Sequence, residues 1–88
     1  MDQNKEAENL KARRARDDKD RRNTFLLDEE QHILRLAGKL CNRVVTKSDD
    51  EWSIALMAVD EALDRYDETR GDFWSFASYV MKNRLTDH

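Results

Sequence analysis

The residue types best suited to chemistry gather near the C-terminal end of the chain, where aromatic rings are interleaved with hydroxyl, amide and cationic groups. Aromatic faces stack on unpaired bases, an amide binds a base edge through a paired donor and acceptor, and lysine neutralises phosphate charge. This mixture indicates contact with nucleic acid. The candidate DNA-binding residues are Trp74, Phe76, Tyr79, Lys82, Asn83 and Thr86.

The same aromatic residues also have a structural interpretation. Phe73 and Phe76 fall on one stripe of a helix, and such a pair more often lies in a hydrophobic core than against a base. For Trp74 and Tyr79 the two uses are evenly balanced. The formal net charge of −3 argues against general affinity for nucleic acid, because nonspecific binders are usually basic.

Neither catalysis nor metal binding finds support in the residue types. Cys41 is the single cysteine, which excludes an internal disulfide and a cysteine zinc site. His32 and His88 are far apart, the chain has no glycine-rich phosphate loop, and the carboxylates of segment 49–66 fit a solvated helix face. We therefore expect no catalytic residue, no metal, no cofactor and no enzyme activity.

Length and composition limit the organisation of the chain. The 88 residues, 40% of them charged, can form one small domain. No apolar run approaches the ~18 residues of a membrane span and no signal-like leader is present, so we expect a cytoplasmic protein without membrane insertion. Residues 1–23 contain one large apolar residue after Met1, which predicts a charged arm, solvated or a frayed helix, before a folded domain over 24–88.

Apolar periodicity predicts an all-α bundle of three main helices, near 29–46, 49–66 and 72–87. Phe25 and its neighbours are expected just ahead of the first helix. Gly38 within that helix either weakens it or permits close packing.

Two of these helices have clear start signals. Ser48 and Glu51 have the spacing of a capping box, in which the Ser48 hydroxyl accepts from the backbone N–H of Glu51. Residues 67–71 predict a turn with Gly71 in the left-handed conformation, and Asp72 then caps the last helix.

The helix predicted over 49–66 has two contrasting faces. Its predicted core face consists of Trp52, Ala55, Leu56, Val59, Ala62, Leu63 and Tyr66. The opposite face is acidic but also carries Ile54 and Met57, which a solvated face usually lacks. We therefore expect both side chains to be substantially exposed. The predicted core stripe of the last helix consists of Phe73, Phe76, Ala77, Val80 and Met81.

Over residues 24–88 the sequence resembles region 2 of bacterial RNA polymerase sigma factors, in particular the I-type sigma factors of Gram-positive bacteria. The resemblance rests on SDDEWSIALMAVDEALDRYD, on GDFWSFAS after the turn and on the helix that ends RLTD. It implies the sigma region 2 fold, docking on core RNA polymerase, and recognition and melting of the promoter −10 element. Family members continue past the equivalent of Asp87 into a domain that contacts the −35 element, so we expect either an N-terminal domain excised from a longer protein or a truncated gene product.

The resemblance also implies roles for individual residues. The helix over 49–66 would dock on the clamp coiled coil of the largest polymerase subunit, and the implied polymerase-binding residues are Asp50, Ser53, Ile54, Met57 and Asp60. Many sigma factors have Gln-Glu where this chain has Ser53-Ile54, so the polar contacts there differ. Family members are silenced by membrane-bound anti-sigma factors, which implies an anti-sigma partner.

On the last helix the resemblance separates two ways of reading promoter DNA. Phe76 and Tyr79 match aromatic positions around the melted strand, whereas Asn83 and Thr86 match positions that read the upstream base pair of the −10 element. Val80 stands where primary sigma factors carry a second tryptophan, which implies weaker strand separation or greater dependence on the remaining aromatic residues.

A different class of function also fits the pattern. The chain can be a non-catalytic helical interaction module that dimerises through Ile54 and Met57, or through the Leu34 side of the first helix. Light scattering and binding to an isolated clamp coiled coil would separate this alternative from the sigma factor hypothesis.

Overall fold

The computed structural model describes residues 3–67, 69 and 71–87. The fold consists of five helices: α1 (Gln3–Asp17), α2 (Lys19–Asp28), α3 (Glu30–Cys41), α4 (Asp50–Arg65) and α5 (Phe73–Asp87). The described residues contain no strand, and the predicted all-α class is confirmed. The predicted helices over 49–66 and 72–87 correspond to α4 and α5 within a residue at each end.

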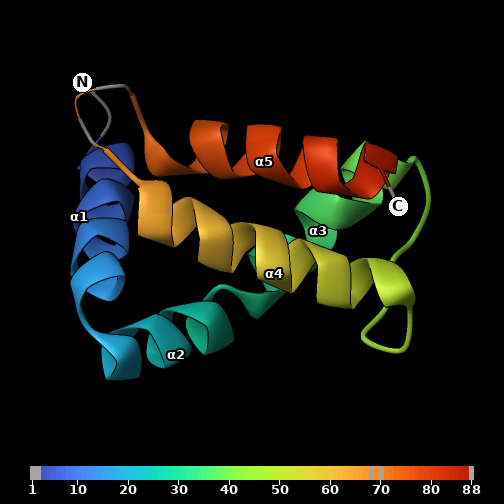
Figure 1. The fold of residues 1–88 in the computed structure, drawn as a ribbon, viewed down its shortest axis with the longest axis horizontal. Helices are drawn as coiled ribbons and strands as arrows, with labels where there is room; N and C mark the ends of the chain where they lie inside the picture. The colour runs from blue at the N-terminus through green and yellow to red at the C-terminus, as the bar shows by residue number, and fades with distance from the viewer. Residues whose placement is uncertain (1–2, 68, 70, 88) are drawn as a thin grey trace.

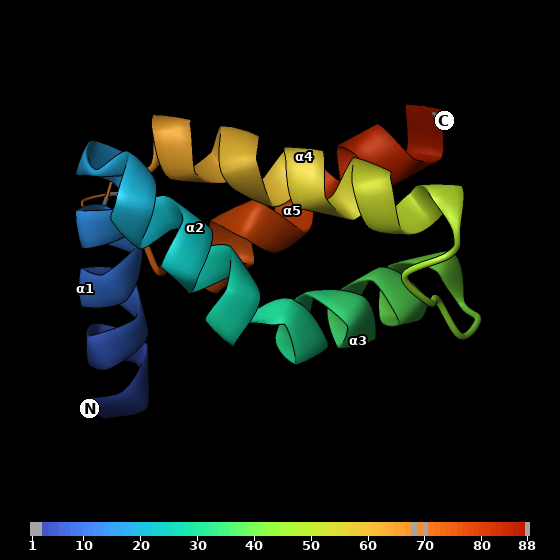
Figure 2. The same cartoon turned by 90° about the horizontal axis from the view of Figure 1, so that it is seen from below.

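Helices α4 and α5 lie side by side and run in opposite directions (Figure 1). Helix α3 packs beneath this pair, and α2 leads from α1 to α3 (Figure 2). Helix α1 stands across the end at which α4 finishes and α5 begins. This arrangement leaves the outer faces of α4 and α5 next to one another and open to solvent.

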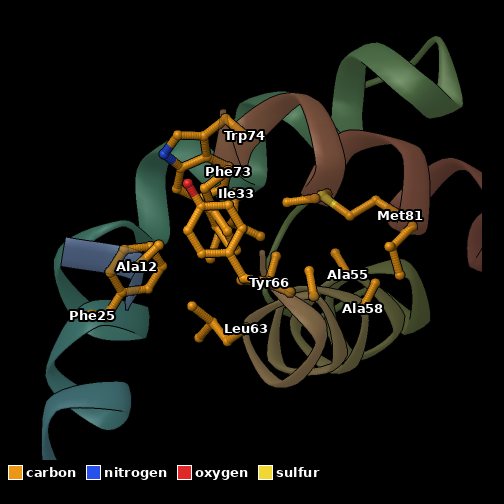
Figure 3. Packing of buried hydrophobic residues seen from close by; sticks show 14 of the residues in the cluster. Ala12, Phe25, Ile33, Ala55, Ala58, Leu63, Tyr66, Phe73, Trp74 and Met81 are labelled. Carbon is orange, nitrogen blue, oxygen red and sulfur yellow. The ribbon is translucent and has the colours of Figure 1, made fainter. Parts of the chain in front are cut away.

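Phe73 lies at the centre of an aromatic cluster that joins α2, α4 and α5 (Figure 3). Its ring centroid lies 5.6 Å from that of Phe25, 5.3 Å from that of Tyr66 and 5.1 Å from that of Trp74. All three contacts are edge-to-face, the geometry that aromatic quadrupoles favour. The side chain of Phe73 is fully buried, so the cluster anchors the start of α5 to the rest of the core.

The first predicted helix, over 29–46, is divided differently in the structure. Asp18 caps α2, since its carboxylate accepts from the backbone N–H groups of Asp20 at 2.9 Å and Arg21 at 3.4 Å. Phe25 therefore lies inside α2 instead of ahead of a helix. Helix α3 ends earlier than predicted because Asn42 takes the left-handed conformation, with φ of 57°.

Gly38 permits a close approach of the chain that follows α3. A Cβ atom at this position would lie 2.9 Å from the carbonyl oxygen of Arg43, which is too close for two non-bonded heavy atoms. The backbone N–H of Arg43 donates to the carbonyl oxygen of Gly38 at 3.0 Å. The packing explanation for this glycine is therefore the correct one.

The expectation of a solvated arm does not hold for α1. Ala12 and Ala15, three residues apart on one helix face, are buried against the core. Their small side chains let α1 approach α4 and α5 closely, although the segment has almost no large apolar residue. The division of the chain after residue 23 stays a prediction.

The predicted capping box at the start of α4 is wrong. Helix α4 begins at Asp50 with Asp49 as its N-cap residue, so Ser48 lies one position too early to cap it. The carboxylate of Asp49 points back along the chain and accepts from the backbone N–H of Thr46 at 2.9 Å. That bond, opposed by desolvation and assisted by Arg43, lowers the pKa of Asp49 below its usual value of 3.8.

We expect Asp49→Asn to remove a pH-dependent part of the stability, whereas Ser48→Ala should leave the denaturation midpoint almost unchanged. A carboxyl whose pKa is lowered by folding stabilises the fold above its unfolded pKa, and that stabilisation is lost as the pH falls through the folded pKa. The difference in urea midpoint between parent and Asp49→Asn should therefore shrink as the pH falls below about 3.8. If Ser48→Ala lowers the urea denaturation midpoint more than Asp49→Asn does, the result would support the capping-box prediction.

The turn between α4 and α5 follows the prediction where it is described. Gly71 has φ of 126°, a conformation that favours glycine. Asp72 caps α5, since its carboxylate accepts from the backbone N–H of Ser75 at 3.2 Å and from its hydroxyl at 2.8 Å. Glu68 and Arg70 of the predicted turn, and His88, lie outside the described residues.

Candidate nucleic-acid interface

One face of α5 presents polar and aromatic side chains to solvent at helical spacing. Tyr79 is 64% exposed, and Lys82, Asn83 and Thr86 are exposed on the turns that follow. The opposite side of the helix is in the core and consists of Phe73, Ala77, Val80 and Met81. We call the four exposed residues Tyr79, Lys82, Asn83 and Thr86 the α5 face. The structure thus brings together four of the six candidate DNA-binding residues.

Phe76 lies neither fully in the core nor fully on the DNA-binding surface, the two positions predicted for it. It is half-buried, packs against the edge of the core and lines two neighbouring hollows. The larger hollow, of about 540 Å³, is bounded by Arg65, Tyr66, Asp67, Gly71 and Asp72. The smaller, of about 240 Å³, lies toward Tyr79 and Asn83. One edge of the Phe76 ring therefore remains accessible beside the α5 face.

Trp74 lies in the core, which corrects its place among the candidates for base stacking. Its side chain is only 7% exposed. The indole stacks on Phe25 with centroids 5.8 Å apart and meets the imidazole of His32 at 4.1 Å. Because the ring is buried among other rings of the fold, we leave Trp74 out of the α5 face.

The implied polymerase-binding residues of α4 are also only partly as predicted. Met57 is 72% exposed, as expected, whereas Ile54 is only partly exposed because it lines a groove between α4 and α5. This groove has a volume of about 570 Å³ and is lined by Ile54, Met57, Asp60, Glu61, Asp64, Arg84 and Asp87. Asp50 and Ser53 are also exposed, and they precede Met57 by about two turns and one turn of α4.

Several acidic side chains around this groove are already paired within the protein. Arg22 of α2 contacts the carboxylate oxygens of Asp60 at 3.2 Å and Asp64 at 2.6 Å. Burial alone would lower the pKa of Arg22, but the hydrogen bonds and charges of both aspartates outweigh it and raise the pKa. Arg84 makes a bidentate contact with Glu61, at 2.9 and 2.8 Å. The groove is therefore less negative than its acidic residues alone suggest.

No group of three or more histidine, cysteine, aspartate or glutamate side chains is placed to hold a metal ion within the described ranges. None of the described helices combines the length and apolar character needed to cross a membrane.

The fold is a small helical bundle in which two neighbouring helices, α4 and α5, face the solvent. The chain belongs to the sigma-70 region 2 family, whose family model matches residues 25–88. This confirms the family that the sequence resemblance indicated.

The chain is similar to several I-type sigma factors. It is 40% identical to RNA polymerase sigma factor SigI8 of Acetivibrio thermocellus over 70 residues, which cover 76% of this chain and 27% of that protein. It is 39% identical to SigI7 of the same organism, over 75% of this chain and 28% of the relative. It is 30% identical to SigI of Bacillus subtilis, over 80% and 28%. The chain thus spans little more than a quarter of the length of these relatives.

Sequence reasoning missed three residues of the segment before the family match. Arg22 joins α2 to α4, as described above. Asn9 and Arg16 of α1 bond to the two ends of the turn between α4 and α5. The signal in the sequence is the face shared by Asn9, Ala12 and Arg16, which recur three and four residues apart.

Proposed function

We propose that this chain is the region 2 module of an I-type sigma factor, which binds core RNA polymerase and recognises and melts the promoter −10 element to start transcription. The observation that carries the proposal is the α5 face. Its residues Tyr79, Asn83 and Thr86 are exposed at one-turn spacing while the opposite side of α5 forms the core. Such side chains contribute little to packing, and their chemistry suits an unpaired base and a base-pair edge.

The proposal divides the work between the two solvent-facing helices. Tyr79, with the accessible edge of Phe76, would stack on bases of the melted strand. Asn83 and Thr86 would read the upstream base pair, and Lys82 would neutralise a phosphate. The exposed Met57 at the centre of the outer face of α4 would meet the clamp coiled coil of the largest polymerase subunit, with Asp50 and Ser53 beside it.

Control of this module by an anti-sigma factor, and its place in the cytoplasm, belong to the same proposal. Both follow from the family and not from a contact in the structure. An anti-sigma factor that covers the outer face of α4 would exclude the polymerase from it.

We expect Asn83→Ala to relax discrimination at one base pair of the −10 element by about 1–3 kcal/mol, because it removes a paired donor and acceptor. Tyr79→Ala should instead weaken binding to the unpaired strand by about 1–3 kcal/mol per stacked base, with little change in duplex preference. The assay mixes this chain with core RNA polymerase and measures binding to promoter fragments whose −10 element is partly single-stranded.

Gln31→Ala is the matched control, because this residue is exposed and lies on a different helix, α3. All three variants should keep the parent's unfolding free energy within about 0.5 kcal/mol, since each changes an exposed side chain. If Tyr79→Ala and Asn83→Ala bind every −10 variant as the parent does, the α5 face does not read DNA.

If the chain is instead a dimerisation module, it should form a stable dimer in solution. The exposure of Met57 is the observation that favours it, whereas Leu34 is partly buried against the core and offers less surface. Light scattering of a stable dimer that core polymerase does not dissociate would support this alternative over the sigma factor proposal.

A further inference from the structure

Helix α1 lies outside the residues that match the family, yet it touches the part of the fold that the proposed function needs. It stands across the end of the α4–α5 pair, where the turn joins the two helices (Figure 1). Ala12 and Ala15 are buried there, and Ala12 belongs to the same buried cluster as Phe25 (Figure 3). This helix is therefore placed to act on the turn between α4 and α5.

Two polar side chains of α1 bond to the backbone at opposite ends of that turn. The side-chain oxygen of Asn9 accepts from the backbone N–H of Phe73 at 2.8 Å, and Arg16 donates from Nη1 to the carbonyl oxygen of Tyr66 at 2.9 Å. Tyr66 is the C-cap residue of α4 and Phe73 is the first residue of α5. The first N–H groups and last C=O groups of a helix lack partners within it, so α1 satisfies one group of each helix.

A third side chain keeps α1 in place for this contact. Arg22 donates to the carbonyl oxygens of Ala15 at 3.3 Å and Arg16 at 2.9 Å, which are at the C-terminal end of α1. The same guanidinium contacts Asp60 and Asp64 of α4. The end of α1 is thus fixed to α4 independently of Asn9.

We propose that Asn9 and Arg16 are positioning residues that set the turn between α4 and α5 for binding of the unpaired promoter strand. The inference rests on the proposed function and deepens it. Tyr66, Asp67, Gly71 and Asp72, at the two ends of the turn, line the 540 Å³ hollow beside Phe76, so a shift of either end changes the shape of that hollow. Within the turn, the hydroxyl of Tyr66 donates to the carbonyl oxygen of Gly71 at 3.5 Å, which is longer than either bond from α1, and Asp67 accepts from the backbone N–H and the hydroxyl of Thr69 at 3.0 and 2.7 Å.

Polymerase docking should not depend on the hydrogen bonds that Asn9 and Arg16 make to the ends of the turn. Met57 precedes Tyr66 by nine residues, which at 1.5 Å per residue places it about 13 Å away along α4. The contacts of α1 lie at the C-terminal end of α4, and the outer face around Met57 does not include them. A loss of DNA binding without a loss of polymerase binding would therefore be specific to the contacts of Asn9 and Arg16 with the turn.

The test measures two affinities for each variant of this chain. One is the affinity for core RNA polymerase, and the other is the affinity of the resulting complex for a labelled single-stranded oligonucleotide with the −10 sequence. Asn9→Ala, which removes a helix-terminal hydrogen bond, should weaken oligonucleotide binding about fivefold to tenfold and change polymerase binding less than about twofold. Arg16→Met should act in the same direction.

Asn9→Asp provides the rescue. A carboxylate still accepts from the N–H of Phe73 and is favoured at a helix N-terminus, so oligonucleotide affinity should return to within about twofold of the parent. Asn9→Gln, whose oxygen is displaced by one methylene, should not rescue and serves as the test variant if Asn9→Ala does not fold. Circular dichroism at the assay temperature verifies that each variant is folded.

Two results would overturn the inference. One is a loss of both affinities to the same extent, which a general structural role of α1 produces. The other is parental oligonucleotide binding by Asn9→Ala and Arg16→Met. Failure of the proposed function itself looks different, because the parent complex would then bind the −10 oligonucleotide no better than a scrambled one.

Discussion

We expect the replacement of Phe73 by alanine to remove a large part of the free energy of unfolding of the protein. A buried phenylalanine replaced by alanine costs about 3–5 kcal/mol, through lost transfer free energy and the cavity left behind. Phe73 is fully buried and meets three other aromatic rings edge-to-face. A domain of this size has roughly 4–13 kcal/mol of stability in total, so this single change removes a large part of it.

Phe76→Ala is the matched control, three residues further along the same helix. Phe76 is half-buried at the edge of the core, so its truncation should cost about 1–2 kcal/mol and leave the domain folded. Urea denaturation followed by circular dichroism compares the two variants. Equal losses would contradict the place of Phe73 at the centre of the core and that of Phe76 at its edge.

The contrast between Phe73 and Phe76 shows how far periodicity can predict this fold. A stripe at 3.6-residue spacing identifies the side of α5 that faces the core, and Phe73, Ala77, Val80 and Met81 are all buried as predicted. The same spacing holds for α4, because the core lies on only one side of each helix. Periodicity does not give depth, since Phe76 lies at the margin where the hollow beside the turn begins.

Trp74 could not be placed from its own helix. It lies on the flank of the α5 stripe, and the residues that bury it are Phe25 of α2 and His32 of α3. Both residues are far from Trp74 in the sequence, and nothing in the sequence around them indicates that they lie close to it in the fold. The choice between core and base stacking depends on tertiary packing, which no local pattern contains.

The polar errors have a similar cause. Ser48 has the capping-box spacing, but Asp49 takes the cap position and its carboxylate is held by the N–H of Thr46. Asn9 and Arg16 are single polar residues in a charged segment, and their partners are backbone groups more than 45 positions away. The spacing of Asn9, Ala12 and Arg16 indicates that they share a helix face, but it does not indicate which backbone groups they bond, so these partners are known only from the fold.

The other large effect is expected at Met57, on the outer face of α4. We expect Met57→Glu to weaken binding to core RNA polymerase by at least about 30-fold, the loss typical of a change at the centre of an interface. Docking would bury the new carboxylate without a partner, on a face that already carries acidic groups. The fold should be unaffected, because Met57 is 72% exposed.

The internal ion pairs explain why Met57 should matter more than the acidic residues beside it. Asp60 is bound by Arg22 at 3.2 Å, so little of its charge is left for a cationic partner. Ile54 is partly enclosed by the groove, and Ile54→Glu would therefore disturb the fold as well as the interface. Met57 is the side chain of this face with the largest exposed apolar surface, and it does not belong to the core.

Competition against a labelled parent chain for core polymerase measures this effect. Met57→Leu, which keeps apolar volume, should bind within about threefold of the parent. Gln31→Glu adds the same negative charge at an exposed position of α3 and should bind as the parent does, which separates a local effect from a change in net charge. Unchanged competition by Met57→Glu, with its fold intact, would show that the outer face of α4 does not dock on polymerase, and the α5 face alone would then have to explain any role of this chain at a promoter.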